Sequence, residues 1–532
     1  MIQRDIRFLD PFAGSGSVSR LARTLGFRVE ANDWEHYSYV LNDCWLALGA
    51  EDLDRAFGSA EGLRRELEEL NALHPHAPGF RETTQGEPYM ARWYAPRSTA
   101  EPVLGRERLF YTAENARFID SVRATIEERY PERDPRSPGG IRRRIFLAAL
   151  VLEAAVHANT SGVFKAYHRG FGGHGGDALK RILARMELEA PCLPDLPACG
   201  VSRMDASAFA SRRPADIVYL DPPYNQHQYG SNYHILNTIV RWDRKPVPLD
   251  IGSDGELERK AGIPDEWKRT SSPFCRKREA AEAMRSLLDS IDASVVVLSW
   301  NGEGHIAVEE LAEILSERGR LEAKTLEYVT YRGGRQSDGR RNANREFLFV
   351  LNTGKKAGGG AQAVLDMRRS SLRDEALRSN YDPRRLGGLF ELRDGFVLAR
   401  TAAIEARLPF VDYRRMKPEA ATILDAMEPD CRDELLRKLL ECACSSAQEN
   451  LDALYVLLAT GDGAGKRARA EVTRYLRKLA HRRYAADFCR YLERYAAFAE
   501  ASSDRAFLSA LDGLKILARK RFAYDTDTYN GI

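Results

Sequence analysis

Long apolar runs are absent from this chain of 532 residues. A helix that crosses a bilayer needs about 20 consecutive apolar residues, and no segment approaches that length, so the sequence predicts no membrane association. The first residues, Met1-Ile2-Gln3-Arg4-Asp5, also lack the apolar stretch of a secretory signal. We therefore expect a cytoplasmic protein.

Cysteine is scarce, since only eight cysteines are scattered along the chain and none forms a C-x-x-C pair. This spacing predicts neither a disulfide framework nor a metal centre. The net charge of +3 is too small to establish nucleic-acid binding, because local clusters of charge matter more than their sum. With 44% hydrophobic and 30% charged residues, a chain of this length fits an enzyme of two or three domains.

The tetrapeptide Asp221-Pro222-Pro223-Tyr224 directly follows the apolar run 216–220. Because proline cannot donate to a sheet ladder, this pattern predicts a buried strand that ends in a rigid loop. Open α/β sheets bind their ligands at that end of a strand. The Asp221 carboxylate and the Pro222 carbonyl could accept the two N–H bonds of a nucleobase amine while Tyr224 stacks on the base. The pattern thus predicts an amino-methylation site, with an ordinary proline turn as the alternative.

A glycine-rich turn near the start of the chain, Phe8-Leu9-Asp10-Pro11-Phe12-Ala13-Gly14-Ser15-Gly16-Ser17, joins an apolar run to a helical pattern over 18–25. Glycines allow a close backbone approach to a ligand. Ser19 stands where the dinucleotide pattern has its third glycine, which argues against a pyrophosphate cradle. The next predicted strand, 28–31, is followed by Asp33, an acid placed to meet a ribose diol. These features predict that the first β-α-β unit of a Rossmann-like sheet binds a nucleoside.

Together the two motifs resemble the Dam-type, alpha-group N6-adenine DNA methyltransferases over residues 8–352. The stretches 110–115, 158–163 and 298–304 look like further parts of that family. The resemblance implies S-adenosylmethionine as cofactor and double-stranded DNA as partner. It implies that the cofactor contacts are Asp10, Pro11, Phe12, Ala13, Gly14 and Gly16 on the methionine side, Asp33 at the ribose, and Asp205 with Ala206 at the adenine. It assigns the base chemistry to Asp221, Pro222, Pro223 and Tyr224.

The family usually has a further N-terminal loop and helix that close over the cofactor. Only nine residues precede Asp10 here, so either the chain starts late, or another segment or a partner takes that role.

Two basic segments are candidate DNA contacts. The segment 331–345, between two strand-like runs, contains Arg332, Arg335, Arg340, Arg341 and Arg345. A hairpin of this composition could hold phosphates, with a solvated hairpin as the alternative. The segment 165–176 mixes glycines and aromatic residues with Lys165 and Arg169. It could wedge into DNA during base flipping, or be a surface loop.

These placements predict an α/β fold with a Rossmann-like, doubly wound methyltransferase sheet built from residues 1–50 and 195–353. Strands are expected near Ile6, Val29, Val218, Val295, Leu326 and Phe347. Residues 51–194 are expected to form a helical insertion with helices over 113–128 and 142–158, and the resemblance implies that this insertion helps to read the target sequence. The Gly/Lys-rich stretch 354–360 is predicted to be a flexible linker.

Residues 361–532 are predicted to form a mainly α-helical C-terminal domain, with long helical patterns over 431–458 and 468–500. The patterns assign this domain no role, although its recurring arginines are compatible with DNA, a protein partner or solvent.

The sequence therefore predicts a site-specific DNA adenine-N6 methyltransferase that flips its target base and serves restriction-modification or phage defence. N4-cytosine methylation and RNA methylation remain open as alternatives, and so does a catalytically idle DNA-binding subunit of a larger complex.

Overall fold

The computed structural model describes residues 5–78, 80, 87–132, 134–172, 178–329, 343–401, 404–460, 465–480 and 482–522. The chain divides into two compact units, Met1–Val364 and Leu365–Ile532. Within the described ranges, no helix is both long enough and apolar enough to cross a membrane.

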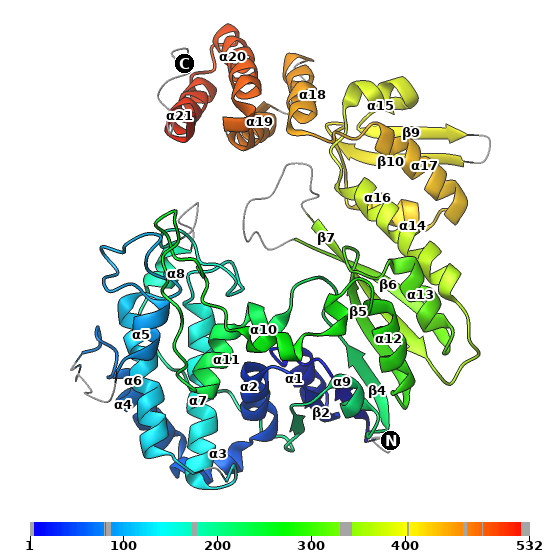
Figure 1. Ribbon diagram of the computed structural model, residues 1–532. Helices are drawn as coiled ribbons and strands as arrows, with labels where there is room; N and C mark the ends of the chain where they lie inside the picture. Colours follow the sequence, from blue (N-terminus) through cyan, green and yellow to red (C-terminus); the bar gives the residue numbers. More distant parts are fainter. Residues whose placement is uncertain are drawn as a thin grey trace. The chain divides into compact units, whose positions relative to one another are not determined.

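A seven-stranded sheet forms the centre of the first unit, in the order β3-β2-β1-β4-β5-β7-β6 (Figure 1). Strands β3, β2, β1, β4 and β5 pair in parallel, and β7 pairs antiparallel with both β5 and β6. The strands are β1 (Arg7–Asp10), β2 (Arg28–Asn32), β3 (Gly200–Ser202), β4 (Ala215–Leu220), β5 (Ala293–Asn301), β6 (Arg320–Val329) and β7 (Ala343–Asn352). The predicted Rossmann-like sheet is confirmed, and β3 is the strand that the sequence did not predict.

The direction of the crossovers places helices on both faces of this sheet. Successive strands move one way from β1 to β3 and the other way from β4 to β5, and right-handed crossovers then put the two sets of helices on opposite faces. Accordingly α1 contacts α2, and α9 contacts α12. These helices are α1 (Ser17–Thr24), α2 (His36–Ala47), α9 (Ala206–Ala210) and α12 (Ala280–Asp289), with α13 (Val308–Ser316) after β5. The strand order reverses between β1 and β4, where sheets of this kind bind ligands.

A helical body lies beside the sheet (Figure 1). It contains α3 (Ala50–Phe57), α4 (Ala60–Asn71), α5 (Tyr89–Tyr94), α6 (Ala113–Arg129), α7 (Pro138–Val156) and α8 (Leu179–Leu183). Its hydrophobic core also includes residues of α2, of α11 (His234–Arg241) and Val247. The buried guanidinium of Arg108 donates to the carbonyls of Pro248, Arg259 and Lys260. The helical body is therefore larger than the predicted insertion 51–194. It includes chain beyond residues 221–224, the predicted catalytic loop.

Three short elements lie between β4 and β5. They are α10 (Tyr229–Asn232), η1 (Asp265–Thr270) and η2 (Pro273–Cys275).

The stretch 354–360 was predicted to be a flexible linker, and that prediction is wrong. The backbone N–H of Gly358 donates to the carbonyls of Ser316 and Gly319, and its carbonyl accepts from Leu321. A Cβ at Gly360 would lie 2.7 Å from the Ser316 hydroxyl. The glycines thus permit close packing beside β6, and α14 (Gly360–Arg378) begins at once.

In the second unit the predicted helical patterns 431–458 and 468–500 are each broken into separate helices. The unit also contains a four-stranded antiparallel sheet in the order β11-β10-β9-β8, which the sequence did not predict. The strands are β8 (Glu391–Arg393), β9 (Phe396–Thr401), β10 (Ile404–Val411) and β11 (Arg415–Met416). The helices are α15 (Pro383–Leu389), α16 (Glu419–Asp425), α17 (Pro429–Glu441), α18 (Ala447–Thr460), α19 (Gly465–Leu479), η3 (Arg482–Tyr484), α20 (Ala485–Ala501) and α21 (Arg505–Phe522). One core joins the sheet to α15–α17, and a second joins α18–α21.

Candidate active site

The catalytic loop begins directly after β4, and its position is fixed from two sides. Pro222 and Pro223 are buried. The Tyr224 carbonyl accepts a hydrogen bond of 2.7 Å from the backbone N–H of His305. The Tyr224 ring stands edge-on to Trp300 of β5, with centroids 6.1 Å apart. The loop is therefore held against the segment that follows the neighbouring strand.

Two oxygens of this loop are available as acceptors. Among the described residues, none donates a hydrogen bond to the Asp221 carboxylate or to the Pro222 carbonyl. Asp221 reaches solvent, yet the protein atoms around its carboxylate remove much of its hydration. That burial, and secondarily the charge of Glu346, raises the pKa of Asp221 to about 6. At neutral pH the site thus offers an ionised carboxylate beside a neutral carbonyl.

Glu346 lies on the same face of the sheet as Asp221. Leu220 pairs with Leu298, and Asn301 pairs with Glu346 on the next strand. Side chains alternate along a strand and paired residues point the same way, so residues 221, 299, 301 and 346 share one face. The Asp221 carboxylate therefore has a second carboxylate nearby, which the sequence did not predict.

The glycine loop after β1 is held open by Asp33 and by side chains of α2. The Asp33 carboxylate accepts from the N–H groups of Gly14 and Glu35, both at 2.8 Å. The Gly14 carbonyl accepts from Ser38 at 2.6 Å and from Asn42 at 3.1 Å. Asp33, predicted to contact a ribose, thus also braces the loop, and burial raises its pKa.

Gly14 and Gly16 serve different needs. Both have positive φ, +53° and +77°, which favours glycine. A Cβ at Gly14 would meet nothing within 4 Å, whereas a Cβ at Gly16 would lie 2.0 Å from Oδ1 of Asn42. Gly14 therefore borders open space where a ligand can approach, and Gly16 permits close packing on α2.

Asp10 is the most deeply buried acid of the site, at 1% exposure. Ser19 donates to its Oδ2 at 2.7 Å, while its Oδ1 is buried without a partner in the described part of the chain. Burial, with a smaller contribution from the charge of Asp221, raises the pKa of Asp10 to about 7. An unsatisfied buried acceptor of this kind fits a cationic or N–H-bearing ligand group.

A pocket lies beside the catalytic loop at the carboxyl ends of β1 and β2. Four predicted cofactor residues and Pro223 of the catalytic loop line it. The lining residues are Pro11, Phe12, Asn32, Asp33, Trp34, Glu35, Met204, Ala206, Pro223, Gln228, Tyr229, Gly230 and Ser272. Asp10 ends β1 and Ala13, Gly14 and Gly16 lie in the loop that follows it, and none of these four lines the pocket. Asp205 is exposed, and its Oδ1 caps α9 by accepting from Ala208 at 3.0 Å.

Sequence reasoning missed several pocket residues. Asn32 donates to the carbonyls of Pro11 and Met204 and accepts from the N–H of Met204, which joins the ends of three segments. Asn32 and Trp34 flank Asp33, so their place after a strand was a usable signal. The contributions of 228–230 and Ser272 depend on tertiary packing alone, and Phe274 packs edge-on against Phe12 at 5.7 Å.

The structure describes three of the seven candidate DNA contacts. Lys165 is half-buried and lies near His227 and Cys275. Burial, and secondarily the charge of Lys165, lowers the pKa of His227. Burial raises the pKa of Cys275 to about 11, and the charge of Lys165 opposes that rise. Arg169 is 83% exposed and pairs with Glu256 at 3.2 Å. Arg345 belongs to β7. Arg332, Arg335, Arg340 and Arg341 lie outside the described residues.

The fold and site together define a methyltransferase-like sheet with a loop that offers two acceptor oxygens beside a pocket at the carboxyl ends of its strands. Residues 2–251 match the D12 class of N6 adenine-specific DNA methyltransferases. The type II methyltransferase M.NlaIII of Neisseria lactamica is 31% identical over 350 residues, which cover 64% of this chain and 89% of that protein. The chain therefore belongs to the D12 class of N6 adenine-specific DNA methyltransferases.

Two further relatives agree. The type II methyltransferase M.CviAII of Paramecium bursaria Chlorella virus 1 is 29% identical, over 65% of this chain and 90% of that protein. The type II methyltransferase M.FokI of Planomicrobium okeanokoites is 27% identical, over 61% of this chain and 45% of that protein. No solved structure matches the chain.

Proposed function

We propose that this chain transfers a methyl group from S-adenosylmethionine to N6 of an adenine flipped out of double-stranded DNA at a specific sequence. Family membership and the curated relatives, named as type II methyltransferases, support this function. The same names support a place in a restriction-modification or phage-defence system.

The residues present fit the cofactor. The unpartnered Oδ1 of Asp10 and the open space at Gly14 suit the methionine part, with its ammonium group. Asp33 suits the ribose, and Trp34, Met204 and Ala206 offer apolar surface for the adenine. When bound, S-adenosylmethionine supplies an electrophilic methyl group on a sulfonium.

Two acceptors in the catalytic loop carry the proposal. An adenine amine is a poor nucleophile because its lone pair is conjugated with the ring. The Asp221 carboxylate and the Pro222 carbonyl would accept hydrogen bonds from its two N–H groups and so draw the nitrogen towards sp³ geometry. Tyr224 would stack on the base. Asp221 is also the nearest base for the proton that leaves N6 after transfer. Preorganised acceptors and proximity would supply the rate enhancement.

Base flipping follows from where this loop lies. The two acceptor oxygens lie at the carboxyl end of the central strand β4, beside a pocket partly enclosed by 228–230 and Ser272. An adenine stacked within a duplex cannot bring its amine there, so the base must leave the helix. Lys165, placed near the catalytic loop, suits a phosphate next to the flipped nucleotide.

Asp221→Ala tests the assignment. We expect methyl transfer to duplex DNA to fall by about 10²–10³ or more, with unchanged affinity for S-adenosylmethionine by calorimetry. Asp216→Ala, at the opposite end of the same strand, is the matched control and should retain activity. Near-normal turnover of Asp221→Ala would refute the catalytic role.

The same assay separates the alternatives. Mass spectrometry distinguishes N6-methyladenine from N4-methylcytosine, and parallel reactions compare duplex DNA with RNA. A wild-type chain that fails to bind S-adenosylmethionine would favour the idle-subunit alternative.

A further inference from the structure

Helix α19 of the second unit carries a solvent face composed almost entirely of basic residues. Its exposed positions are Lys466, Arg467, Ala470, Arg474, Arg477 and Lys478. At 3.6 residues per turn these positions fall within an arc of about 120°. Apart from Ala470, each of them is lysine or arginine, so one side of the helix presents a stripe of positive charge.

Two other helices of the second unit lack such a stripe. The exposed positions of α20 mix Arg490 with Glu493 and Glu500, and those of α17 mix Arg437 with Asp430, Glu434 and Glu441. Mixed signs of this kind are typical of a solvated surface. The one-signed face of α19 is therefore a local feature of this helix and does not reflect the composition of the whole unit.

The opposite side of α19 is anchored inside the unit. Val472, Leu476 and Leu479 are buried in the helical core. Glu471 pairs with Arg415 at 2.7 Å, and the Tyr475 hydroxyl accepts from Asn380 at 2.8 Å. Glu471 and the Tyr475 hydroxyl of α19 thus face inward and Arg469 pairs with Asp504 at 2.6 Å, whereas the exposed basic residues face outward.

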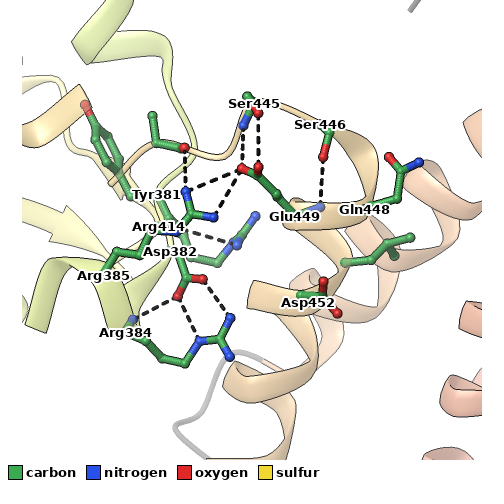
Figure 2. Close-up of polar contacts among 12 residues, drawn as sticks. Tyr381, Asp382, Arg384, Arg385, Arg414, Ser445, Ser446, Gln448, Glu449 and Asp452 are labelled. Atoms are coloured by element: carbon green, nitrogen blue, oxygen red, sulfur yellow. Dashed lines mark hydrogen bonds and ion pairs between the residues drawn. The ribbon is translucent and has the colours of Figure 1, made fainter. Parts of the chain in front are cut away.

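Polar contacts also hold α18, the helix before α19, to the sheet half of the unit (Figure 2). Glu449 accepts from the N–H of Ser445 at 2.9 Å and pairs with Arg385 at 3.5 Å. The buried Arg414 donates to Asn450 at 2.9 Å. The basic face therefore belongs to a braced scaffold, which lowers the entropic cost of binding a rigid partner.

Three residues of the stripe have no carboxylate partner within the described part of the chain: Lys466, Arg467 and Arg474. Arg467 also lines a pocket with Arg414 and Arg415, whose charges are paired there with Glu471. The Arg474 guanidinium lies 4.8 Å from the Tyr475 ring centroid, an arrangement that steadies the side chain and leaves its charge available.

We propose that this face of α19 binds the phosphate backbone of double-stranded DNA without regard to sequence. The choice of DNA as the polyanion rests on the proposed function. From Lys466 to Lys478 the helix advances about 18 Å, enough to meet several phosphates of one strand. The second unit would then add affinity for duplex outside the methylated site and keep the enzyme on long DNA.

The test uses the full chain with Lys466→Gln, Arg467→Gln and Arg474→Gln combined. Binding to a long duplex of random sequence is measured by fluorescence anisotropy at several salt concentrations. Three lost phosphate contacts should reduce the slope of the logarithm of the binding constant against the logarithm of the salt concentration by about 2.7. The loss of affinity between 50 and 200 mM salt then becomes about 40-fold smaller than in the wild type. Affinity for S-adenosylmethionine should stay unchanged.

The matched control combines Lys438→Gln, Arg490→Gln and Lys515→Gln. It removes the same charge from the same unit, but at residues paired with Glu434, Asp487 and Asp512. If the triple variant is unstable by thermal melting, Arg474→Gln alone should still lower the slope by about one. The proposal would be overturned if the α19 variant kept the binding and the slope of the wild type, or if the control variant were weakened equally. It would also be overturned if the wild type did not bind the long duplex. Failure of the proposed function would appear separately, as absence of N6-methyladenine in wild-type reactions.

Discussion

The pKa of the Asp221 carboxylate depends on the residues that surround it in the folded chain. The sequence placed this carboxylate at the end of a strand, and the motif alone indicated its use. It could not predict that burial and Glu346 would raise the pKa of Asp221 to about 6, because Glu346 is 125 residues away and meets Asp221 only through the pairing of β4, β5 and β7. The roles of Asp33 in bracing Gly14, and of Asp205 in capping α9, are likewise products of tertiary structure.

This setting makes a prediction about pH. Asp221 must be ionised to accept the amine, so activity should rise as the pH increases through about 6. Removing a like charge with Glu346→Gln should lower the pKa of Asp221 and move the acid limb of the kcat/KM profile to lower pH. Glu322→Gln, an exposed acid on the adjacent β6, should leave the limb in place. An unshifted limb in Glu346→Gln would show that Glu346 does not act on Asp221.

At the scale of elements, local patterns succeeded where apolar periodicity was strong. The helix predicted over 113–128 is observed as Ala113–Arg129, with Thr112 as its N-cap. The single helical pattern 431–458 is instead broken between α17 and α18, because Cys444 donates to the Asn380 carbonyl and Ala443 pairs with Tyr381. The β8–β9 hairpin was missed although its signal is local, since Asp394-Gly395 between Arg393 and Phe396 is a favoured two-residue turn.

The glycine loop gives the prediction at this scale. Gly16→Ala would combine a strained positive φ with a clash on Asn42, and we expect weaker S-adenosylmethionine binding and a loss of stability of about 1–3 kcal/mol. Adding Asn42→Ala removes the clash but leaves the strain, and also removes a donor to the Gly14 carbonyl. The double variant should therefore regain only part of the stability in thermal melts. Wild-type stability and cofactor affinity for Gly16→Ala would contradict this account of the loop.

At the scale of the whole molecule, the two units divide the work. Every residue assigned to chemistry or to the cofactor lies in Met1–Val364. The division at 364 lies inside α14, beyond the predicted linker, because 354–360 packs on β6 and belongs to the first unit. A composition rich in glycine and lysine predicts a flexible linker, whereas here the glycines permit close backbone contact.

A chain ended after Val364 should therefore fold and bind S-adenosylmethionine with wild-type affinity. It should methylate short duplexes but bind long DNA more weakly, because α19 is gone. A chain ended at Gly354 lacks the pairing of Gly358 with β6 and should be less stable. If the folded chain ended at Val364 fails to bind S-adenosylmethionine by calorimetry, the second unit is part of the cofactor site.

Nucleoside analysis of cellular DNA tests the central claim most directly. The chain and its Asp221→Ala variant are expressed in cells that have no adenine methylation of their own, and the DNA is digested and analysed by mass spectrometry. We predict N6-methyladenine in DNA from cells with the unaltered chain and none with the Asp221→Ala variant. N4-methylcytosine, no modified base, or equal N6-methyladenine in both would contradict the claim.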